Sequence, residues 1–528
     1  MNTNKFKRYF IEDMWKIFNY KRWENEVYAF LSAIIIGFIA HGYIFFNNIT
    51  LHDNTYNFYM GGTYTLGRWM LAKLLRLSQI VYDTNYLHYS VPWYLGFVSL
   101  FWIGMSAALI IYMLEIKNKI FSILIGGILV SFPVITSMFG FMFTAGMYSF
   151  GTFMGLAGVF FVSSIDKIKK WKKLIFVVIG ILLQAGSVGV YQANIGVIAT
   201  FTLIMFLKSL DYEEITDNKA IIKRIIYFVL ETFGYLFAYY IASVYYVNKI
   251  GAELSSYQGI GNLGKVGVTD YLLRIPLAYK EFINPTPEVS QYMYCGGVRY
   301  FYYFILILIF LFAVISLVRQ YRKSVFVGSI YTLAVLVFPL CANIIYVMCD
   351  SNIHSLMVYG EVMIFVLLIY LCSVPKIKRD KLLKAVTICI ITFVIILYCR
   401  YANVCYLKAD YVQKAGISYF DRMITRIESA EGYEAGMPVV FIGEAPEIDA
   451  SVFLYNEFNE IQILPYKFDT MVNNYNWQAF MKSNCGFNPP RGDAAMFADN
   501  EEVIAMPMYP SDGSIQIISD CVVVKLQQ

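Results

Sequence analysis

The chain has 528 residues, of which 58% are hydrophobic and only 15% charged, and its mean hydropathy is +0.55. These values lie far from those of globular proteins and exclude an ordinary water-soluble enzyme, a disordered chain, a coiled coil and a nucleic-acid-binding protein. The formal net charge of +5 identifies no partner by itself, because in a membrane chain the position of each Lys and Arg matters more than their sum.

The N-terminal segment, 1–26, is basic and its apolar residues follow helical spacing, which predicts a cytoplasmic amphipathic helix in the membrane interface. The next apolar run, 27–46, is too long and begins too far from the terminus to be a cleaved signal peptide, so it is the first expected span. Runs of spanning length recur. We expect eleven spans, the other ten at 93–114, 120–138, 145–164, 174–188, 191–207, 225–247, 300–318, 324–347, 355–374 and 385–403.

The uncharged stretch 174–207 is longer than one pass requires, because a helix rises about 1.5 Å per residue and the hydrocarbon core is roughly 30 Å thick. We therefore expect two passes that turn near Gly186 and Gly189. This choice places the basic segments on one side of the membrane, as the positive-inside rule requires. The N-terminus is then predicted inside and the C-terminus outside.

The large outward segments are expected at 48–92, 249–298 and 404–528, and function should be sought there. The second of them contains an apolar-faced segment that predicts an interfacial helix. In the last segment the composition changes: a polar helix is expected near 408–430, followed by strand-like runs at 438–443, 514–518 and 521–526. The predicted fold class is an all-α polytopic membrane domain, 27–403, with a small extracytoplasmic α/β domain, 404–528.

The first outward segment carries an acid and an arginine fifteen residues apart, Asp53 and Arg68. A carboxylate just beyond the first span could take a proton from an acceptor hydroxyl, and a guanidinium could hold a phosphate by paired hydrogen bonds. The alternative is that Asp53 caps the following helix and Arg68 binds lipid headgroups.

Several motifs occur in an order that resembles the GtrII-type membrane glucosyltransferases. They are the basic N-terminal segment, the acidic loop after the first span, Gly-Arg-Trp at 67–69, the Ser-Phe-Pro-Val-Ile-Thr-Ser run from 131, and Gly-Val-Tyr-Gln-Ala at 189–193. The similarity covers roughly 25–400. It implies a GT-C-like helical membrane fold and transfer of a sugar from a polyprenyl-phosphate carrier to an acceptor on the outer face.

The resemblance carries over to few residues of this chain. The acidic motif corresponds to Asp53, and the Gly-Arg motif corresponds to Gly67 and Arg68. His52 and Asn54 flank Asp53 where a second Asp is often found in the family. That departure weakens a two-carboxylate or metal-bridging mechanism and leaves an inactive or altered enzyme open, so Asp53 alone is the expected base and no metal ligand is assigned.

Charged residues inside spans are costly and are treated as functional candidates. Glu361 is expected to reach an outward cavity together with Asp350, His354 or Arg299, and an ion pair with Arg400 is the alternative. Glu231, near the cytoplasmic end of its span, is expected to meet Arg224 or to extend to the interface. Three polar residues at an outward turn are interpreted as helix-to-helix hydrogen-bonding groups; they are Tyr191, Gln192 and Asn194.

Aromatic side chains are too abundant to mark a sugar site by number, with 44 Tyr and 42 Phe. Membrane aromatic belts give the same excess. Only those beside Asp53 and Arg68 are candidates for substrate contact; they are Tyr56, Tyr59, Tyr64 and Trp69.

The sequence thus predicts a hexosyltransferase, with glucose the expected sugar, that uses a polyprenyl-phosphate donor and modifies a cell-surface glycan or teichoic-type polymer. Its expected partners are membrane lipids, a flippase and a carrier-charging glycosyltransferase. No nucleic-acid partner is expected. No cofactor is expected to be required, and the sequence leaves dependence on a divalent metal ion undecided. Two alternatives remain: a flippase or transporter built around Glu361 and Glu231, and a non-catalytic scaffold for envelope assembly.

Overall fold

The computed structural model describes residues 23–50, 52–55, 60–82, 91–165, 170–212, 218–255, 267–294, 297–349, 353–374, 380–444 and 477–526. The chain forms two compact units. Unit 1 comprises 1–42 and 59–402, and unit 2 comprises 43–58 and 403–528. The amphipathic helix expected at 1–26 lies almost entirely outside the described residues.

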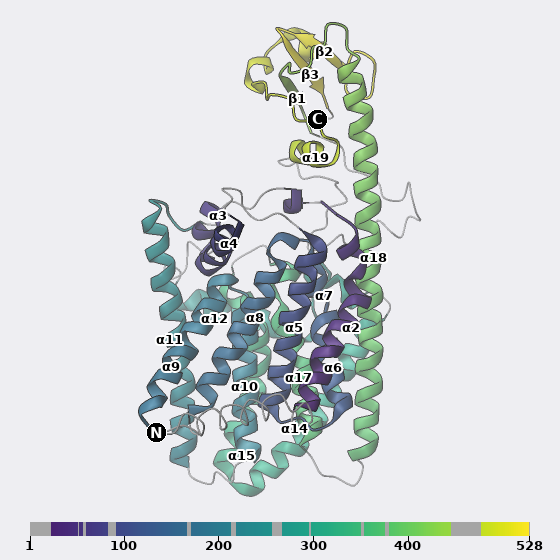
Figure 1. Ribbon diagram of the computed structural model, residues 1–528. Helices are drawn as coiled ribbons and strands as arrows, with labels where there is room; N and C mark the ends of the chain where they lie inside the picture. The colour runs from purple at the N-terminus through teal and green to yellow at the C-terminus, as the bar shows by residue number, and fades with distance from the viewer. Residues whose placement is uncertain are drawn as a thin grey trace, which may run out of the picture. The chain divides into compact units, whose positions relative to one another are not determined.

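Unit 1 is helical (Figure 1). Within the described ranges, nine helices are long and apolar enough to cross a membrane. Each coincides with one of the expected spans, because uninterrupted apolar sequence satisfies its backbone groups in lipid only as a helix. They are α2 (Glu24–Phe46), α5 (Pro92–Leu114), α8 (Met142–Ser163), α9 (Lys170–Val190), α10 (Asn194–Tyr212), α11 (Asn218–Lys249), α14 (Val298–Lys323), α15 (Val325–Ala342) and α18 (Asp380–Glu428).

The two remaining expected spans are irregular. The run 120–138 folds as α6 (Lys119–Ser131) and α7 (Pro133–Phe139), bent by 44°, and counting this pair as one span brings the number in the described chain to ten. Pro133 explains the bend, since proline removes a backbone donor and clashes with the preceding turn. The run 355–374 forms two 3-10 turns, η6 (Ser355–Met357) and η7 (Tyr359–Val362), before the short helix α17 (Met363–Ser373). Eleven full spans are therefore not established.

The stretch 174–207 forms two helices, as expected, but the turn lies elsewhere. α9 ends at Val190 and α10 begins at Asn194, so the chain turns at 191–193 and not at Gly186 or Gly189. Both glycines lie within α9, because glycine is tolerated in membrane helices where close packing supports the backbone.

The central helices of unit 1 pack with their backbones close together. α8 packs against α9 and α5. A Cβ atom on Gly158 of α8 would lie 2.7 Å from the carbonyl oxygen of Gly180 on α9, so only hydrogen fits there. Nearer the end of α9, Ser187 donates a hydrogen bond of 2.6 Å to the carbonyl of Gly151. These contacts hold the C-terminal end of α9 in place, and they thereby position residues 191–193, which follow it.

A buried carboxylate joins four helices at the C-terminal end of α10. The side chain of Asp211 is fully buried. It accepts hydrogen bonds from Arg319 and Gln320 of α14, from Tyr331 of α15 and from Tyr370 of α17, the last three at 2.6, 3.2 and 2.5 Å. Such a charge is stable only because several donors surround it.

The same end of unit 1 carries further basic side chains. Three lysines bridge helix ends there: Lys119 to Glu24 at 2.5 Å, Lys208 to Glu115 at 2.9 Å, and Lys323 to the carbonyl of Leu210 at 2.9 Å. The ends of α5, α10 and α14 and the beginnings of α2 and α6 therefore meet at this basic end.

The segment between α2 and α5 forms η2 (His52–Thr55), α3 (Met60–Thr65) and α4 (Trp69–Tyr82), of which η2 belongs to unit 2. The segment after α11 contains α12 (Val268–Ile283), where an apolar-faced helix is expected, then α13 (Pro287–Ser290) and η5 (Gln291–Tyr294).

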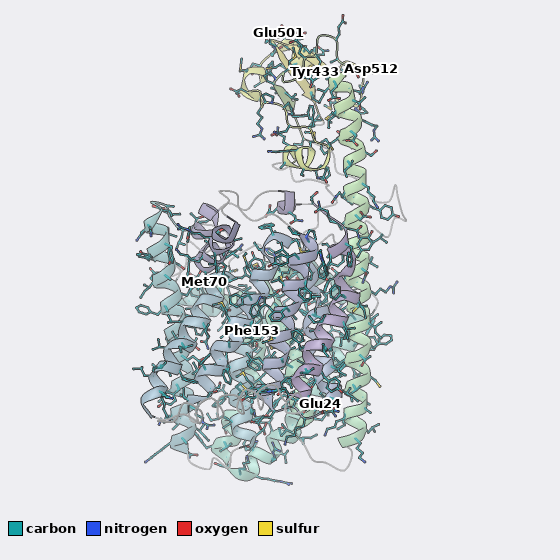
Figure 2. The ribbon with its side chains drawn as sticks, in the orientation of Figure 1. Glu24, Met70, Phe153, Tyr433, Glu501 and Asp512 are labelled. Atoms are coloured by element: carbon teal, nitrogen blue, oxygen red, sulfur yellow. The ribbon has the colours of Figure 1, made fainter. Side chains whose placement is uncertain are left out.

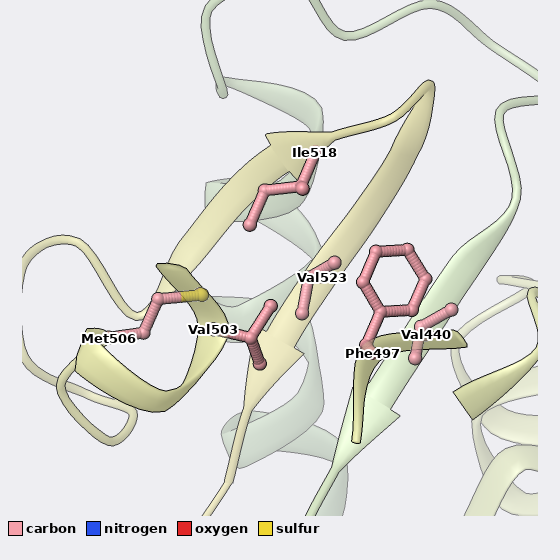
Figure 3. Packing of buried hydrophobic residues seen from close by; sticks show 6 residues of the cluster. All are labelled: Val440, Phe497, Val503, Met506, Ile518 and Val523. Atoms are coloured by element: carbon pink, nitrogen blue, oxygen red, sulfur yellow. The ribbon is translucent and has the colours of Figure 1, made fainter. Parts of the chain in front are cut away.

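Unit 2 contains a small mixed sheet of order β1-β3-β2. β1 (Val439–Ile442) pairs parallel with β3 (Cys521–Lys525), and β2 (Ile515–Ile518) pairs antiparallel with it. All three strands lie where strand-like runs occur in the sequence. The described helices beside the sheet are α19 (Trp477–Asn484), η10 (Ala494–Phe497) and α20 (Glu501–Ala505). A compact apolar cluster fills one face of the sheet (Figure 3): Val440, Phe497, Val503, Met506, Ile518 and Val523.

The polar helix expected near 408–430 is not a separate element. α18 continues without interruption through 49 residues from Asp380 to Glu428. The junction 404–407 contains no glycine or proline that would end a helix, so the apolar and polar segments form one helix.

Candidate active site

The Gly-Arg-Trp motif forms the tight turn between α3 and α4. The Gly67 amide donates to the Tyr64 carbonyl and the Arg68 amide to the Thr63 carbonyl, both at 2.9 Å. This hydrogen-bond pattern ends a helix and requires a left-handed residue, and Gly67 has a φ of +70°. The glycine therefore turns the chain so that the next two side chains leave it from the start of α4.

Gly67 is enclosed by two side chains from other helices. A Cβ atom at this position would lie 2.6 Å from the hydroxyl oxygen of Tyr239 on α11 and 3.0 Å from Nε2 of Gln192. The Gln192 amide donates to the carbonyl of Leu66 at 2.6 Å and contacts the Tyr239 hydroxyl at 3.1 Å. The turn is thus held to the segment between α9 and α10.

Arg68 lies against a pair of tyrosines. Its Nη1 donates to the hydroxyl of Tyr148 on α8 at 3.3 Å, and its Cζ lies 5.0 Å from the ring centroid of Tyr191. The two rings are themselves stacked, with centroids 4.9 Å apart and planes at 25°. Arg68 as a residue is half-buried, and this contact orients its guanidinium.

Trp69 closes the other side of the motif. A Cβ atom on Gly189 would lie 2.6 Å from Cε2 of the indole, so the ring rests directly on the backbone of α9. Tyr246 of α11 stacks between Trp69 at 5.9 Å and Tyr64 at 5.4 Å. Met70, labelled in Figure 2, lies against α9 at Gly186. Gly186 and Gly189, where we expected a turn, are instead the positions at which α4 packs against α9.

Two sequence motifs that lie more than a hundred residues apart therefore meet. Gly67 and Trp69 contact Gln192 and Gly189, and Arg68 contacts Tyr191. The interpretation of the polar turn residues as helix-to-helix groups holds for Asn194, which bonds Thr152 of α8 at 3.2 Å and the Ser187 carbonyl at 3.1 Å. Gln192 has a different role, because it holds the loop that carries Arg68.

A small cavity with both polar and apolar lining residues adjoins the tyrosine pair. It has a volume of about 30 Å³, and Tyr148, Tyr191, Asn194, Ser149 and Thr152 are among its lining residues. A site of this size with several polar partners suits one or two water molecules and not a sugar.

The electrostatic character of this region is cationic. Besides Arg68, α4 contributes Lys73, whose Nζ lies 4.7 Å from the centroid of the Tyr246 ring. Burial raises the pKa of Tyr64, with the neighbouring Tyr246 adding to the effect, so this phenol stays protonated and can donate a hydrogen bond. Two cations beside neutral phenols form a surface that favours a phosphate group.

Asp53 belongs to unit 2, whereas Arg68 belongs to unit 1. Asp53 is half-buried in η2, and the next residue, Asn54, is buried and donates to the carbonyl of Ile49 at 2.8 Å. Upstream, the Thr50 amide donates to Oε1 of Gln413 on α18 at 2.7 Å. The segment around Asp53 is therefore anchored within its own unit. His52 begins η2, and Tyr56 lies outside the described residues.

Glu361, the centre of the second predicted group, is hydrogen-bonded to a residue outside that group. Glu361 is buried in η7, and its Oε2 accepts a hydrogen bond of 3.0 Å from Tyr292. Arg299 instead donates to Asn284 at 2.6 Å and to Tyr303 at 2.7 Å. His354 directly precedes η6 and is half-buried, and Asp350 lies outside the described residues.

The alternative pairings proposed for the two intramembrane acids are not formed. Arg400 is exposed on α18, away from the buried Glu361. Glu231 accepts a hydrogen bond of 2.5 Å from Gln184 of α9, and this is its partner within the described chain. Among the described residues, no group of three or more His, Cys, Asp or Glu could hold a metal ion.

Tyr148 and Tyr239 were not identified from the sequence as site residues. Nothing local distinguishes them in a chain with 44 tyrosines. One signal does exist for α11: its buried residues include Glu231, Tyr235, Tyr239 and Ser243, a polar row at four-residue spacing in an apolar helix. A row of this kind marks the face that meets other protein groups and not lipid.

Fold and site together define a polytopic membrane protein with a Gly-Arg-Trp turn at the end of its helices opposite to the basic end. The comparison with known families gives its identity. The sequence profile of the family described as glucosyl transferase GtrII matches residues 42–365, more than half of the chain. The chain belongs to this family, and it is a membrane glucosyltransferase. No curated protein and no solved structure gives a significant match. Family membership favours the enzyme over the transporter and scaffold alternatives.

Proposed function

We propose that this enzyme transfers a hexose from a polyprenyl-phosphate carrier to a cell-surface glycan or teichoic-type polymer at the outer face of the membrane. The observation that carries the proposal is the fixed Gly-Arg-Trp turn, in which the half-buried residue Arg68 contacts Tyr148 and Tyr191. A preoriented cation at a helix-bundle end suits a lipid-linked phosphate, which stays at the membrane surface.

The proposed reaction is a substitution at the anomeric carbon. The acceptor oxygen forms a bond to this carbon, the bond to the carrier phosphate breaks, and its electron pair goes to the phosphate. Arg68 stabilises the second negative charge that develops on this leaving group. Trp69, Gly67 and Gln192 act by positioning, because they hold the turn from which Arg68 extends.

The proposed general base is Asp53, which would take the proton of the acceptor hydroxyl. Its half-buried position in η2, on a segment anchored to α18, suits a group that must keep one orientation. His52, Asn54 and Tyr56 are proposed acceptor contacts, and Glu361, Arg299, His354 and Asp350 are proposed substrate contacts of lower rank. The proposal needs no second carboxylate.

The proposed orientation places the basic end in the cytoplasm. Lysines and arginines gather where α5, α10 and α14 end, whereas the Gly67 turn meets the opposite ends of α9 and α10. The sugar donor would then have to be made inside by a carrier-charging glycosyltransferase and moved outward by a flippase. Both are proposed as partners, together with membrane lipids.

The test is reconstitution in liposomes with polyprenyl-phosphate glucose and surface polymer from a deletion strain. We expect Asp53→Asn to lower the transfer rate by about 10²–10⁴-fold and Arg68→Ala by about 10²–10³-fold. Matched controls are Asp270→Asn and Arg76→Ala, which remove exposed charges of the same type. Wild-type rates for Asp53→Asn would remove the base, and wild-type rates for Arg68→Ala would remove the phosphate contact.

A further inference from the structure

Unit 2 contains a cavity of its own, between the helix α19 and the strand β1. It has a volume of about 320 Å³, which is at the lower end of the range for small-molecule sites and suits one sugar or polyol unit. Its walls come from α19, from β1 and from the segment 487–491. The cavity shares no residue with the Gly67 turn, so it is a separate site within unit 2.

A glycine turn folds the chain back on α19 and so forms one wall of the cavity. α19 ends at Asn484, and Gly486 has a φ of +68°, a conformation that favours glycine. The amides of Cys485 and Phe487 both donate to the carbonyl of Met481, at 2.9 and 3.3 Å. Phe487 is thereby returned to the last turn of α19, where it lines the cavity together with Met481.

The segment after this turn is held against β1. The Val439 amide donates to the carbonyl of Pro490 at 3.0 Å, and the Gly492 amide donates to the carbonyl of Val439 at 3.1 Å. Arg491, which lies between these two residues, pairs with Val439 as a parallel bridge. Pro489 and Pro490 further restrict the backbone, because the ring of proline fixes φ. The position from which the Arg491 side chain extends is therefore well defined.

The lining contains aromatic rings and amides, which are groups that suit a carbohydrate or a polyol. Phe441 and Phe487 supply the rings, and Gln478 and Asn488 supply the amides. A ring offers apolar contact to C–H groups, and an amide can serve neighbouring hydroxyls because it both donates and accepts. A purely apolar ligand would leave both amides without hydrogen bonds from the ligand.

The charge of this cavity is positive. Among the described residues that line it, Arg491 is the one that carries a charge, and it is exposed. Asp493, two residues further on, caps η10, since its Oδ1 accepts a hydrogen bond of 3.0 Å from the amide of Ala495. A guanidinium in a cavity lined by no acid favours a phosphate, whose oxygens match its paired donors.

α19 connects this cavity to the segment that carries Asp53. η2 packs against α19 within unit 2. Thr50, three residues before Asp53, is hydrogen-bonded to Asn484 of α19, with the hydroxyl oxygen 2.8 Å from Nδ2. Asn484 follows the cavity residue Met481 by three residues, or about 4.5 Å along the helix. A ligand in the cavity therefore lies close to the segment of the proposed base.

We propose that the α19–β1 cavity binds a phosphate-bearing repeat unit of the acceptor, with the phosphate at Arg491 and the hydroxyls at Gln478 and Asn488. This inference rests on the proposed function and narrows it, because it makes the acceptor an anionic, teichoic-type polymer and not a neutral glycan. The cavity selects and holds the polymer, and it takes no part in bond formation.

The test is equilibrium binding to the purified full-length enzyme without sugar donor, measured by fluorescence anisotropy with dye-labelled oligo(glycerol phosphate). We expect Arg491→Gln to weaken binding about fivefold, the effect of one exposed charged contact. Ala479→Trp, which fills the cavity without changing its charge, should weaken binding at least about tenfold. Arg422→Gln removes an exposed arginine of α18 in the same unit and is the matched control, which should bind as the wild type does.

A neutral competitor and a kinetic readout complete the test. An unlabelled dextran oligosaccharide should compete at least about tenfold less well than unlabelled oligo(glycerol phosphate), because it has no charge for Arg491. In the transfer assay Arg491→Gln should raise the acceptor KM about fivefold and leave the donor KM unchanged. Equal competition by dextran, or wild-type affinity in a folded Arg491→Gln or Ala479→Trp, would overturn the proposal. Binding is measured without transfer, so this proposal and the catalytic role of Asp53 fail separately.

Discussion

Replacing Gly67 by alanine is the sharpest perturbation of the candidate site. The new Cβ would lie 2.6 Å from the Tyr239 hydroxyl oxygen and 3.0 Å from Nε2 of Gln192. The left-handed φ of +70° adds about 1–2 kcal/mol of backbone strain, and loss of the Gln192–Tyr239 hydrogen bond adds about 0.5–1.5 kcal/mol. We therefore expect a destabilisation of about 1.5–3.5 kcal/mol.

The effect on transfer should exceed the effect on folding. A shift of the turn moves Arg68, and a misplacement of about 1 Å can cost roughly 10²-fold in rate. The assays are thermal unfolding in detergent and donor-dependent transfer in liposomes. Gly42→Ala is the matched control, because a Cβ at this α2 position would have no heavy atom within 4 Å.

A second substitution distinguishes this mechanism from general damage. In Gly67→Ala with Tyr239→Phe the clashing oxygen is absent, and the nearest remaining atom of that ring is Cζ at 3.7 Å, an ordinary contact. The double variant should recover part of the stability lost by Gly67→Ala. If Gly67→Ala is as stable and active as the wild type, or if the double variant is no better than the single one, the account of this turn is wrong.

Three further results are expected. Asp211→Ala should destabilise the protein by about 1–3 kcal/mol, because it leaves the buried donors of Gln320, Tyr331 and Tyr370 without an acceptor, whereas the exposed Asp270→Ala should shift thermal unfolding little. Tyr148→Phe should raise the donor KM by about 3–10-fold through loss of one hydrogen bond to the motif arginine; an unchanged KM would speak against that contact. Burial, assisted by Asp421, raises the pKa of Cys485 to about 12, so its thiol stays protonated at neutral pH and its maleimide labelling should keep rising through pH 10; a plateau near pH 9 would contradict this, and Asp421→Asn should speed labelling.

The helical membrane body could be predicted from the sequence because hydropathy and spanning length depend on local composition. The division of 174–207 into two helices follows from length alone. The position of the turn does not, since Gly186 and Gly189 are retained within α9 by the side chains that pack on them. α18 shows the converse: a change from apolar to polar composition need not end a helix when no breaking residue is present.

Only some residues of the candidate site could be predicted from the sequence. Arg68 was identified because a charge is conspicuous in an apolar chain, and Gly67 was identified because the Gly-Arg-Trp motif resembles that of the family. Tyr148 and Tyr239 come from helices distant in the sequence, and their roles arise from tertiary packing, which composition does not encode. The placement of Asp53 and Arg68 in separate units is likewise a property of the folded chain.

Asp211 has a mechanical consequence for unit 1. One carboxylate that is shared by α10, α14, α15 and α17 fixes the axial register of these helices at that end. If any of them slid by one turn, about 5.4 Å, the buried Asp211 carboxylate or its donors would lose their hydrogen-bond partners. Relative movement of these helices is therefore confined to pivoting about this clamp, and its amplitude grows toward the end where Gly67 meets Gln192.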